Sequence, residues 1–504
     1  MRGTTRPRRA GTVAEARAKG DAAGPDTALA LAEIRALVGE QAVVTEARRL
    51  LAYESDANSL LGGAPAAVVL PATPSEAAAV LSVLVRHGVP FLPRGAGTGL
   101  SGGAVAASGE VVVSLTRLSR IEAVDLENEA VVVETGVTNA RVSAAVAAQG
   151  RFYAPDPSSQ AACTIGGNLA ENAGGSHCLK YGVTLNHVRF ADVVYADGEA
   201  LRLGGLAPDM PGYDLLGLFI GSEGTLGTAT RAGLALTRVP RAVRTVLALF
   251  DSVPDASRAV SAVIAAGIVP AAMEMMDSLA IEGVERGPYK VGFPPEAGAV
   301  LLIEVDGREE GVRVQAARIE QICRGRGLMS VRVAASPEER ALWWANRKTA
   351  FGAMANLARS YYVQDGVVPR SRLPQVLDEV AAVGRRFDLR IANVFHAGDG
   401  NLHPLILFDD SRPAERERAV AAGTAILTAC VAHGGSVTGE HGVGLEKRAE
   451  MALMFTADEL ALQDRVRRVF DPSGLANRGK VLPPPGDARA AALMAAAGRG
   501  AARA

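Results

Sequence analysis

Four residues in the last quarter of the chain have the types and spacing of a metal-assisted acid-base site. His396 and His403 flank a Gly-Asp-Gly turn in the segment IANVFHAGDGNLHPLILF (391–408), whose pattern predicts strand, turn and strand. A hairpin of that length can bring two imidazoles within reach of one ion, and Glu440 in the segment 434–444 offers a third donor. We expect these three side chains to hold a divalent metal, most simply zinc, with a fourth position left open.

His441 directly follows Glu440, so the two side chains point in different directions. His441 is therefore free to act as a general base beside the metal. The alternative, in which this histidine only fills a turn among glycines, stays open at the level of sequence.

A glycine-rich run, PRGAGTGLSGG at 93–103, lies between an apolar segment and a second one, EVVVSL at 110–115. Its exposed backbone N–H groups could form a nest for an anion, although clustered glycines can also mark no more than a flexible turn. Gly97, Gly99 and Gly102 satisfy the dinucleotide fingerprint G-x-G-x-x-G. That fingerprint needs a helix at its last glycine, whereas only AVAAS follows here before the next predicted strand begins. We therefore expect a loop between two strands.

Two further runs rich in small and polar residues follow at 156–182 and 221–227, and three such loops indicate one long polar ligand. In order and spacing they resemble the flavin domain of the vanillyl-alcohol-oxidase (PCMH-type) superfamily. That resemblance implies that the first loop holds the FAD pyrophosphate and that the later loops line the ribityl chain and the ring. The first loop contains no histidine, so we expect the FAD to be non-covalent. The residues expected at the cofactor in these loops are Arg94, Gly95, Ala96, Gly97, Thr98, Gly99, Leu100, Ser101, Pro157, Ser158, Ser159, Thr164, Gly166, Gly167, Asn168, Asn172, Gly174, Gly175, Tyr181, Gly182, Glu223, Gly224 and Gly227.

The motifs EMMD (274–277), YYVQDGVVPR (361–370) and FDPSGLANRGK (470–480), together with the histidine motifs, narrow the resemblance. They resemble a group of FAD-linked 2-hydroxy-acid dehydrogenases that includes the D subunit of bacterial glycolate oxidase, over residues 28 to 483. The group implies FAD, a divalent metal, and oxidation of a D-2-hydroxy acid to its 2-oxo acid. It also implies that His396, His403 and Glu440 are the metal ligands, that His441 is the catalytic base, and that Arg347 clamps the substrate carboxylate. A planar guanidinium suits that task.

Two departures from the group bear on substrate and cofactor. Its hydroxyglutarate branch has a lysine shortly before the position of Asp365, where this chain has Val363 and Gln364. This difference favours a smaller acid without a second carboxylate. In the closing motif Arg478 replaces a proline, which leaves Asn477 and Lys480 as expected flavin contacts in a less rigid turn.

Short Val-rich strands that alternate with helical stretches predict an α+β fold. We expect a two-part PCMH-type FAD-binding domain, an α+β substrate-capping domain, and a C-terminal helical segment that returns to the flavin. The segment 339–360 is expected to form one long helix. The expected divisions are a disordered extension at 1–26, the FAD-binding domain at 27–241, the capping domain at 242–440, the returning segment at 441–483, and a disordered tail at 484–504.

A formal net charge of −1 and 4% aromatic residues give no electrostatic footprint for nucleic acid, which we exclude as a partner. The four cysteines form no C-x-x-C pair, so no internal iron-sulfur or disulfide relay is expected. Electrons must then leave through an external acceptor. The resemblance implies FAD-domain and iron-sulfur partner subunits, in a cytoplasmic protein that reaches the membrane peripherally, if at all, through them.

Three other functions remain in view at this point. A non-catalytic FAD-binding accessory subunit would lack the histidine motifs, and a flavin reductase of the peptidoglycan pathway would share only the flavin domain. A D-2-hydroxyglutarate dehydrogenase would share these motifs but would also carry the lysine that this chain lacks. The histidine motifs favour the small-acid oxidoreductase over the first two.

Overall fold

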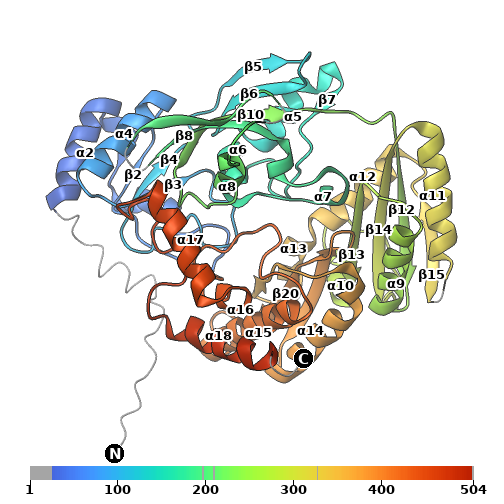
Figure 1. Cartoon of the computed structure of the whole chain (residues 1–504). Coiled ribbons are helices and arrows are strands. Elements are labelled where there is room, and N and C mark those ends of the chain that lie inside the picture. The colour runs from blue at the N-terminus through green and yellow to red at the C-terminus, as the bar shows by residue number, and fades with distance from the viewer. Residues whose placement is uncertain (1–24, 196–197, 208–209, 326, 502–504) are drawn as a thin grey trace, which may run out of the picture.

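The computed structural model describes residues 25–195, 198–207, 210–325 and 327–501, arranged as an FAD-type half and a cap that face each other (Figure 1). The predicted disordered extension lies outside the described residues, apart from its last two positions, which begin helix α2. No helix among the described residues has both the length and the apolar character needed to cross a membrane.

The first sheet carries the glycine-rich loop. Its strands follow the order β1-β2-β4-β3, and β2, β4 and β3 are parallel. The loop connects β3 to β4 without a helix, as the sequence predicts, so the dinucleotide fold is excluded. Thr73 caps the covering helix α4 by accepting a hydrogen bond from the backbone of Glu76. The elements are α2 (Pro25–Val38), β1 (Val43–Val44), α3 (Ala47–Leu50), β2 (Ala67–Val69), α4 (Pro74–Arg86), β3 (Phe91–Arg94) and β4 (Val111–Ser114).

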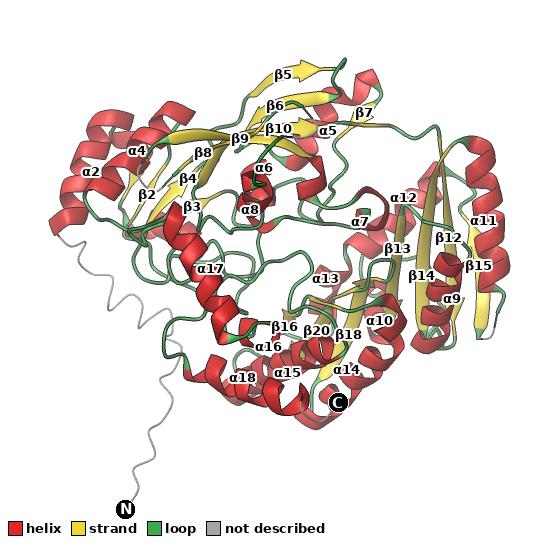
Figure 2. Cartoon of the chain, viewed as in Figure 1, coloured by secondary structure: helices red, strands yellow, loops and turns green. Residues whose placement is uncertain are grey.

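A second, antiparallel sheet in the order β5-β6-β10-β8-β9 completes the FAD-type half (Figure 2). Helix α6 packs against β10 and brings the second polar loop beside the first. The elements are β5 (Ile121–Asp125), β6 (Ala130–Glu134), α5 (Asn139–Val146), β7 (Arg151–Phe152), α6 (Ile165–Glu171), α7 (Cys178–Tyr181), β8 (Val188–Val194), β9 (Ala200–Gly204), α8 (Leu215–Phe219), β10 (Thr228–Ala235) and β11 (Thr237–Arg238).

The cap is a 9-stranded sheet with helices on both faces. Successive residues of its strands enter different cores: Leu301 packs with the layer of α9 and α11, while Leu302 packs with that of α10 and α12. Residues on one face of a strand therefore pack against the helices on that face of the sheet. The elements are β12 (Ala242–Phe250), α9 (Val253–Ala265), β13 (Ala272–Asp277), α10 (Ser278–Glu285), β14 (Ala299–Gly307), α11 (Glu309–Cys323), β15 (Leu328–Val333), α12 (Pro337–Lys348), α13 (Ala350–Ala353), β16 (Ser360–Val363), β17 (Gly366–Val367), α14 (Leu373–Phe387), β18 (Arg390–His396), β19 (Asn401–Leu402), β20 (Pro404–Phe408) and α15 (Pro413–Ala432).

The prediction of one long helix over 339–360 is wrong in its second half. It breaks at Thr349, whose hydroxyl donates to the carbonyls of Ala345 and Asn346, and a strand begins at Ser360. The break turns the chain after Arg347, which therefore lies near the end of α12.

The C-terminal segment contains α16 (Met451–Met454), α17 (Ala457–Phe470) and α18 (Ala488–Ala501). It returns to the first sheet, where Ala476 bridges Phe91 in parallel beside β3. The prediction of a disordered tail is wrong for 488–501. This alanine-rich stretch has high helix propensity, and Ala490 packs in a buried cluster with Ala449 and Ala452.

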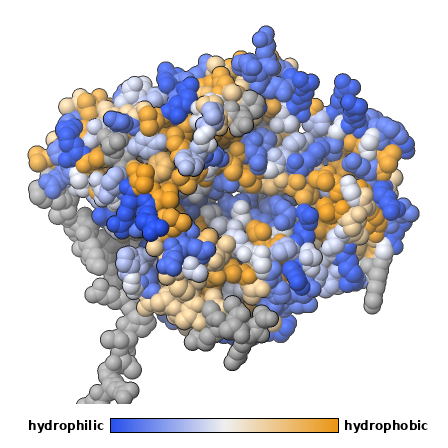
Figure 3. Space-filling model, viewed as in Figure 1, coloured by the Kyte–Doolittle hydropathy of each residue, from blue (hydrophilic) through white to orange (hydrophobic). Residues whose placement is uncertain are grey.

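Hydrophilic and hydrophobic residues are interspersed on the face of the molecule drawn in Figure 3. The residues that could do chemistry are instead gathered inside, where the two halves meet.

Candidate functional site

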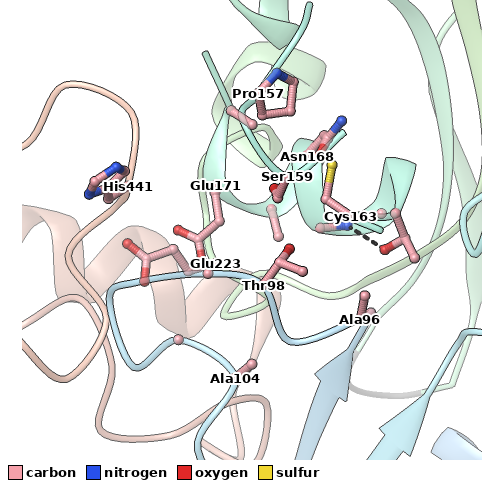
Figure 4. A pocket seen from close by; sticks show the side chains of 18 of the residues that line it. Ala96, Thr98, Ala104, Pro157, Ser159, Cys163, Asn168, Glu171, Glu223 and His441 are labelled. Atoms are coloured by element: carbon pink, nitrogen blue, oxygen red, sulfur yellow. Dashed lines mark hydrogen bonds between the residues drawn. The ribbon is translucent and has the colours of Figure 1, made fainter. Parts of the chain in front are cut away.

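A pocket between the two halves brings most of the predicted site residues together (Figure 4). Its FAD-type wall comes from the loop after β3, from α6 and from the loop before β10. Its cap wall comes from α12, α13, β18 and the loop after α15. The lining includes, from the predicted set, Arg94, Gly95, Ala96, Gly97, Thr98, Gly99, Leu100, Pro157, Ser158, Ser159, Thr164, Gly166, Gly167, Asn168, Gly174, Glu223, Gly224, Gly227, Arg347, His396, His403, Glu440 and His441.

The glycine-rich loop is held open by Arg94 at the end of β3. Its guanidinium donates to the carbonyls of Ala104, at 2.6 Å, and Ser55, at 2.8 Å. A Cβ atom at Gly97 would lie 2.2 Å from Nη2 of Arg94, and Gly97 has a φ of +71°, which favours glycine. The loop therefore presents backbone rather than side chains to the pocket, as an anion nest requires.

Some residues predicted to touch FAD lie behind the wall instead. Asn477 donates to the carbonyls of Gly103 and Glu223, and Lys480 donates to that of Val105, so both fasten the loops from the rear. Both side chains are buried against backbone carbonyls and neither lines the pocket, so their direct contact with FAD stays a prediction. The predicted residues absent from the lining are Ser101, Asn172, Gly175, Tyr181, Gly182, Asn477 and Lys480.

One buried glutamate connects the two walls, and a second buried glutamate lies beside it. Glu223 accepts hydrogen bonds from the backbone N–H groups of Val443, at 2.6 Å, and Gly444, at 2.7 Å, and so ties the loop after His441 to the FAD-type half. Glu171, which the sequence analysis missed, lies beside Glu223 in Figure 4. Burial and the charge of Glu223 raise the pKa of Glu171 well above its usual range, so this carboxyl stays neutral.

His396, His403 and Glu440 converge as predicted. The Nε2 atoms of His396 and His403 lie 3.2 and 3.1 Å from Oε1 of Glu440. Donors at ~2.0–2.1 Å from a tetrahedral zinc are separated by about 3.3 Å, so these two separations suit such an ion, and all three donor atoms lie within 4.8 Å of one another. Register explains the convergence: His396 ends β18 and pairs with Asn401 on β19, two residues before His403.

The charges of this trio support one another. Burial disfavours the charged form of His396, but the carboxylates of Glu274 and Glu440 raise its pKa. Burial likewise disfavours the charged form of Glu440, but His396 and His403 hold its pKa well below the usual range. Glu440 is therefore a carboxylate, the form that ligates metals.

His441 stacks on His403, with ring centroids 4.9 Å apart. Burial lowers the pKa of His441 to about 4, against the opposing effect of the Asp365 carboxylate, so its imidazole is neutral and able to accept a proton. Asp365 accepts hydrogen bonds from the backbone N–H groups of Gly439 and His441 and from the hydroxyl of Thr438. The backbone at His441 is thus held by a carboxylate 76 residues away.

Arg347 projects from α12 into the same pocket, with 7% of its side chain exposed. Its Nη2 lies 2.5 Å from Oε2 of Glu274, but neither Nη2 nor Nε has a hydrogen-bond partner of good geometry among the described residues. A buried guanidinium with unsatisfied donors is suited to a carboxylate ligand.

Sequence reasoning missed several residues of the pocket. Thr135 and Phe219 line the FAD-type wall, and Phe351 packs edge-on against His403. Glu274 was noted only as part of a motif and was given no role. A glutamate at an apolar-looking strand position was the one available signal, because lone charged residues inside strands are almost never buried without a partner.

Models of two protein families match the chain. The model described as "FAD binding domain" matches residues 65–204, and the model described as "FAD linked oxidases, C-terminal domain" matches residues 239–481. Together they span the two halves that form the pocket.

The chain is 46% identical over 434 residues to glycolate oxidase subunit GlcD of Escherichia coli (strain K12), which covers 86% of this chain and 87% of that protein. It is 38% identical over 86% of its length to glycolate oxidase subunit GlcD of Bacillus subtilis (strain 168), covering 92% of that protein. It is 32% identical over 85% of its length to a D-lactate dehydrogenase of Anaerostipes hadrus, also covering 92% of that protein.

Among solved structures, p-cresol methylhydroxylase with bound substrate superposes with a TM-score of 0.77 at 18% identity, covering 92% of this chain and 98% of that chain. At this identity the match establishes the shared PCMH-type fold alone. That fold places the two matched domains on opposite sides of the pocket.

Proposed function

Because the chain belongs to the family of FAD-linked oxidases that contains the glycolate oxidase GlcD subunits, we propose that it oxidises a small 2-hydroxy acid. The acid is of the glycolate or D-lactate type, the product is the 2-oxo acid, and FAD receives the electrons. The observation that supports this proposal is the presence of an unsatisfied buried guanidinium, a neutral imidazole and a three-donor ligand set in one pocket with the flavin-type loops.

The proposed steps divide among the chain's own residues. Arg347 binds the substrate carboxylate, and His441 accepts the proton of the 2-hydroxyl. Asp365 keeps His441 in position through its backbone contacts. Bound FAD would supply the two-electron acceptor, and a zinc ion held by His396, His403 and Glu440 would lower the pKa of the hydroxyl. The pocket wall of residues 93–103 contributes the anion nest for the cofactor's pyrophosphate.

The size of the acid follows from the segment before Asp365. Gln364 is fully buried and Val363 is apolar, and neither lines the pocket, so this segment offers no cation for a second substrate carboxylate. Steady-state rates with glycolate, D-lactate, D-glycerate and D-2-hydroxyglutarate, with a dye as acceptor, test the proposal. We expect the shorter acids to have the higher kcat/KM, and a preference for D-2-hydroxyglutarate would overturn the assignment.

The proposed FAD is non-covalent, because the loop at 93–103 contains no histidine. Acid precipitation should leave a colourless pellet and a yellow supernatant. A pellet that stays yellow after washing would contradict this part of the proposal.

The proposed electron acceptor is an iron-sulfur partner subunit, with an FAD-domain subunit in the same complex. The four cysteines, at 163, 178, 323 and 430, are free in the structure, and burial raises the pKa of the thiols of Cys323 and Cys430 to about 12. The chain alone therefore has no thiol relay among them. It should reduce dichlorophenolindophenol faster than oxygen, whereas peroxide formation at the rate of dye reduction would indicate a self-sufficient oxidase.

A further inference from the structure

Helix α12 presents two arginines to two buried glutamates of the cap sheet. Arg340 and Arg347 are seven residues apart, two helical turns, and so lie on one face of the helix. Glu304 on β14 is paired with Ala272, two residues before Glu274 on β13. Because residues two apart share a face of a strand, both glutamates face the helix from neighbouring strands. The ion pair of Arg340 and Glu304 can therefore be compared with that of Arg347 and Glu274.

The pair of Arg340 and Glu304 is closed. Nε and Nη2 of Arg340 donate to the two carboxylate oxygens at 2.8 and 2.7 Å. The indole N–H of Trp344 and the hydroxyl of Thr245 add two more bonds at 2.7 Å. Every oxygen of this carboxylate is occupied by protein, which is the expected state of a structural buried ion pair.

The pair of Arg347 and Glu274 is open on the side of the arginine, whose Nε and Nη2 lack a hydrogen-bond partner of good geometry among the described residues. Oε2 of Glu274 contacts Arg347, while Oε1 and Oε2 lie 2.8 and 2.9 Å from Nδ1 of His396. Glu274 has no exposed side-chain surface. One carboxylate is therefore shared between the guanidinium expected to bind substrate and an imidazole of the three-donor set.

This sharing fixes the proton on His396. An ionised carboxylate can only accept, so when a metal takes Nε2 the one remaining ring hydrogen lies on Nδ1, facing Glu274. Nε2 is the atom that faces Glu440. A carboxylate behind a metal-bound histidine raises its basicity and fixes its orientation.

We propose that Glu274 is a positioning residue that couples the two halves of the reaction site, since it holds Arg347 for the substrate carboxylate and sets the tautomer of His396 for the metal. The inference rests on the proposed function for the roles of Arg347 and His396. It adds that those roles depend on a single carboxylate that touches neither substrate nor flavin.

The substitution Glu274→Gln separates the two tasks that one carboxylate performs. The amide has one oxygen. If this oxygen accepts from His396, the NH₂ group opposes Arg347; if it faces Arg347, the NH₂ donates to Nδ1 and moves the ring proton to Nε2, where metal must bind. We expect zinc affinity to fall about 10–100-fold, and KM for the acid to rise by a similar factor, with FAD retained. Glu274→Asp keeps the charge but shortens the side chain, and should restore part of both losses.

Glu304→Gln is the matched control, because it removes an equally buried charge that pairs with the same helix. It should lower thermal stability but leave zinc content, zinc affinity and KM unchanged. Zinc is measured by mass spectrometry of the purified holoenzyme and by competition with a chelator, and FAD by absorbance.

Failure of this inference is distinguishable from failure of the proposed function. If wild-type protein holds zinc and Arg347→Lys raises KM, yet Glu274→Gln changes neither quantity, the role of Glu274 is wrong and the function stands. If wild-type protein holds no metal and Arg347→Lys leaves KM unaltered, the proposed function itself fails. Should Glu274→Gln not fold, Glu274→Asp decides: unchanged zinc affinity and KM would overturn the inference, and a loss in both would support it.

Discussion

The wall at residues 93–103 and the wall at residues 391–441 differ in the part of the chain that they offer to a ligand. The first offers backbone: five of its eleven residues are glycines, and its one arginine donates to backbone carbonyls. The second offers side chains, with imidazoles and carboxylates packed within 4 Å of one another. Substitutions that enlarge a residue of the first wall should therefore reduce FAD binding most. In the second wall, substitutions that remove a side chain should reduce metal binding and turnover most.

Gly97→Trp tests the backbone-built wall and should have the largest effect. A side chain at this position would collide with the Arg94 guanidinium and force the loop to change shape, so we expect FAD affinity to fall at least about 100-fold, or about 2.8 kcal/mol, and turnover to vanish. Flavin absorbance of the purified variant is the measurement.

Gly109→Trp is its control, because Gly109 also has a positive φ, of +74°, but nothing lies within 4 Å of its Cβ position. Both variants carry the same backbone strain. A full flavin spectrum in Gly97→Trp, or an equal loss in both variants, would show that the loop does not bind the cofactor through its backbone.

His403→Ala tests the side-chain-built wall by removal. Loss of one of three ligands should release the metal and lower kcat by about 10⁴-fold, since a metal supplies several kcal/mol of charge stabilisation, while FAD remains bound. His433→Ala is the control, because His433 pairs with Glu379 at the end of α15, outside the pocket. Release of FAD together with the metal would mean that the two walls are not independent.

His441→Asn should act more selectively than loss of a ligand. Asparagine keeps the backbone N–H that Asp365 accepts but cannot serve as a base, so we expect kcat to fall about 10³-fold with normal metal and FAD content. Single-turnover reduction of the flavin is the direct measurement. Near-normal turnover would remove His441 from the mechanism.

The smallest effect concerns His177, which joins the FAD-type half to the cap. It lies 2.8 Å from Asp156 of the FAD-type half and 3.6 Å from Glu304 of the cap, and stacks on Trp344. Burial alone would lower the pKa of His177, but the two carboxylates raise it to about 10 from 6.5. A raised folded-state pKa gives stability that is fully present below pH 6.5 and is lost as pH rises toward 10.

His177→Phe preserves a ring against Trp344 and removes the charge. We expect about 1.5–3 kcal/mol less stability at pH 6, and a difference from wild type that shrinks between pH 6.5 and 10. Urea unfolding at several pH values measures this difference. A difference that stays constant with pH would mean that packing, rather than charge, joins the two halves here.

Sequence patterns predicted much of this arrangement where the signal is local. Alternation and turn residues placed the strands around His396 and His403, and the absence of a helix after Gly103 distinguished the loop from a dinucleotide site. Sequence patterns carry no information where the cause is distant. They do not show that Asn477 and Lys480 donate to backbone carbonyls more than 250 residues away in sequence.

The roles of Glu171, Glu274 and Asp365 were not predictable in the same way. Each is a single acidic residue whose effect depends on partners brought by other strands or loops, with Glu274 and His396 separated by 122 residues. Periodicity reports which face of an element is buried but not which buried charges meet. The helix α18 was missed for a related reason, because alanine-rich composition predicts helix and disorder alike until a packing partner is known.

The hydrogen bond between Glu223 and the N–H of Val443, 220 residues further along, also sets a time order during synthesis. At about 5–20 residues per second, a ribosome needs roughly 10–40 s to add that length of chain. Throughout this interval the glycine-rich loop and its supporting sheet are already made, while the loop carrying His441 does not yet exist. The nascent chain thus passes through a stage in which the glycine-rich loop exists without His441 and without Asn477 and Lys480, which fasten it in the finished protein.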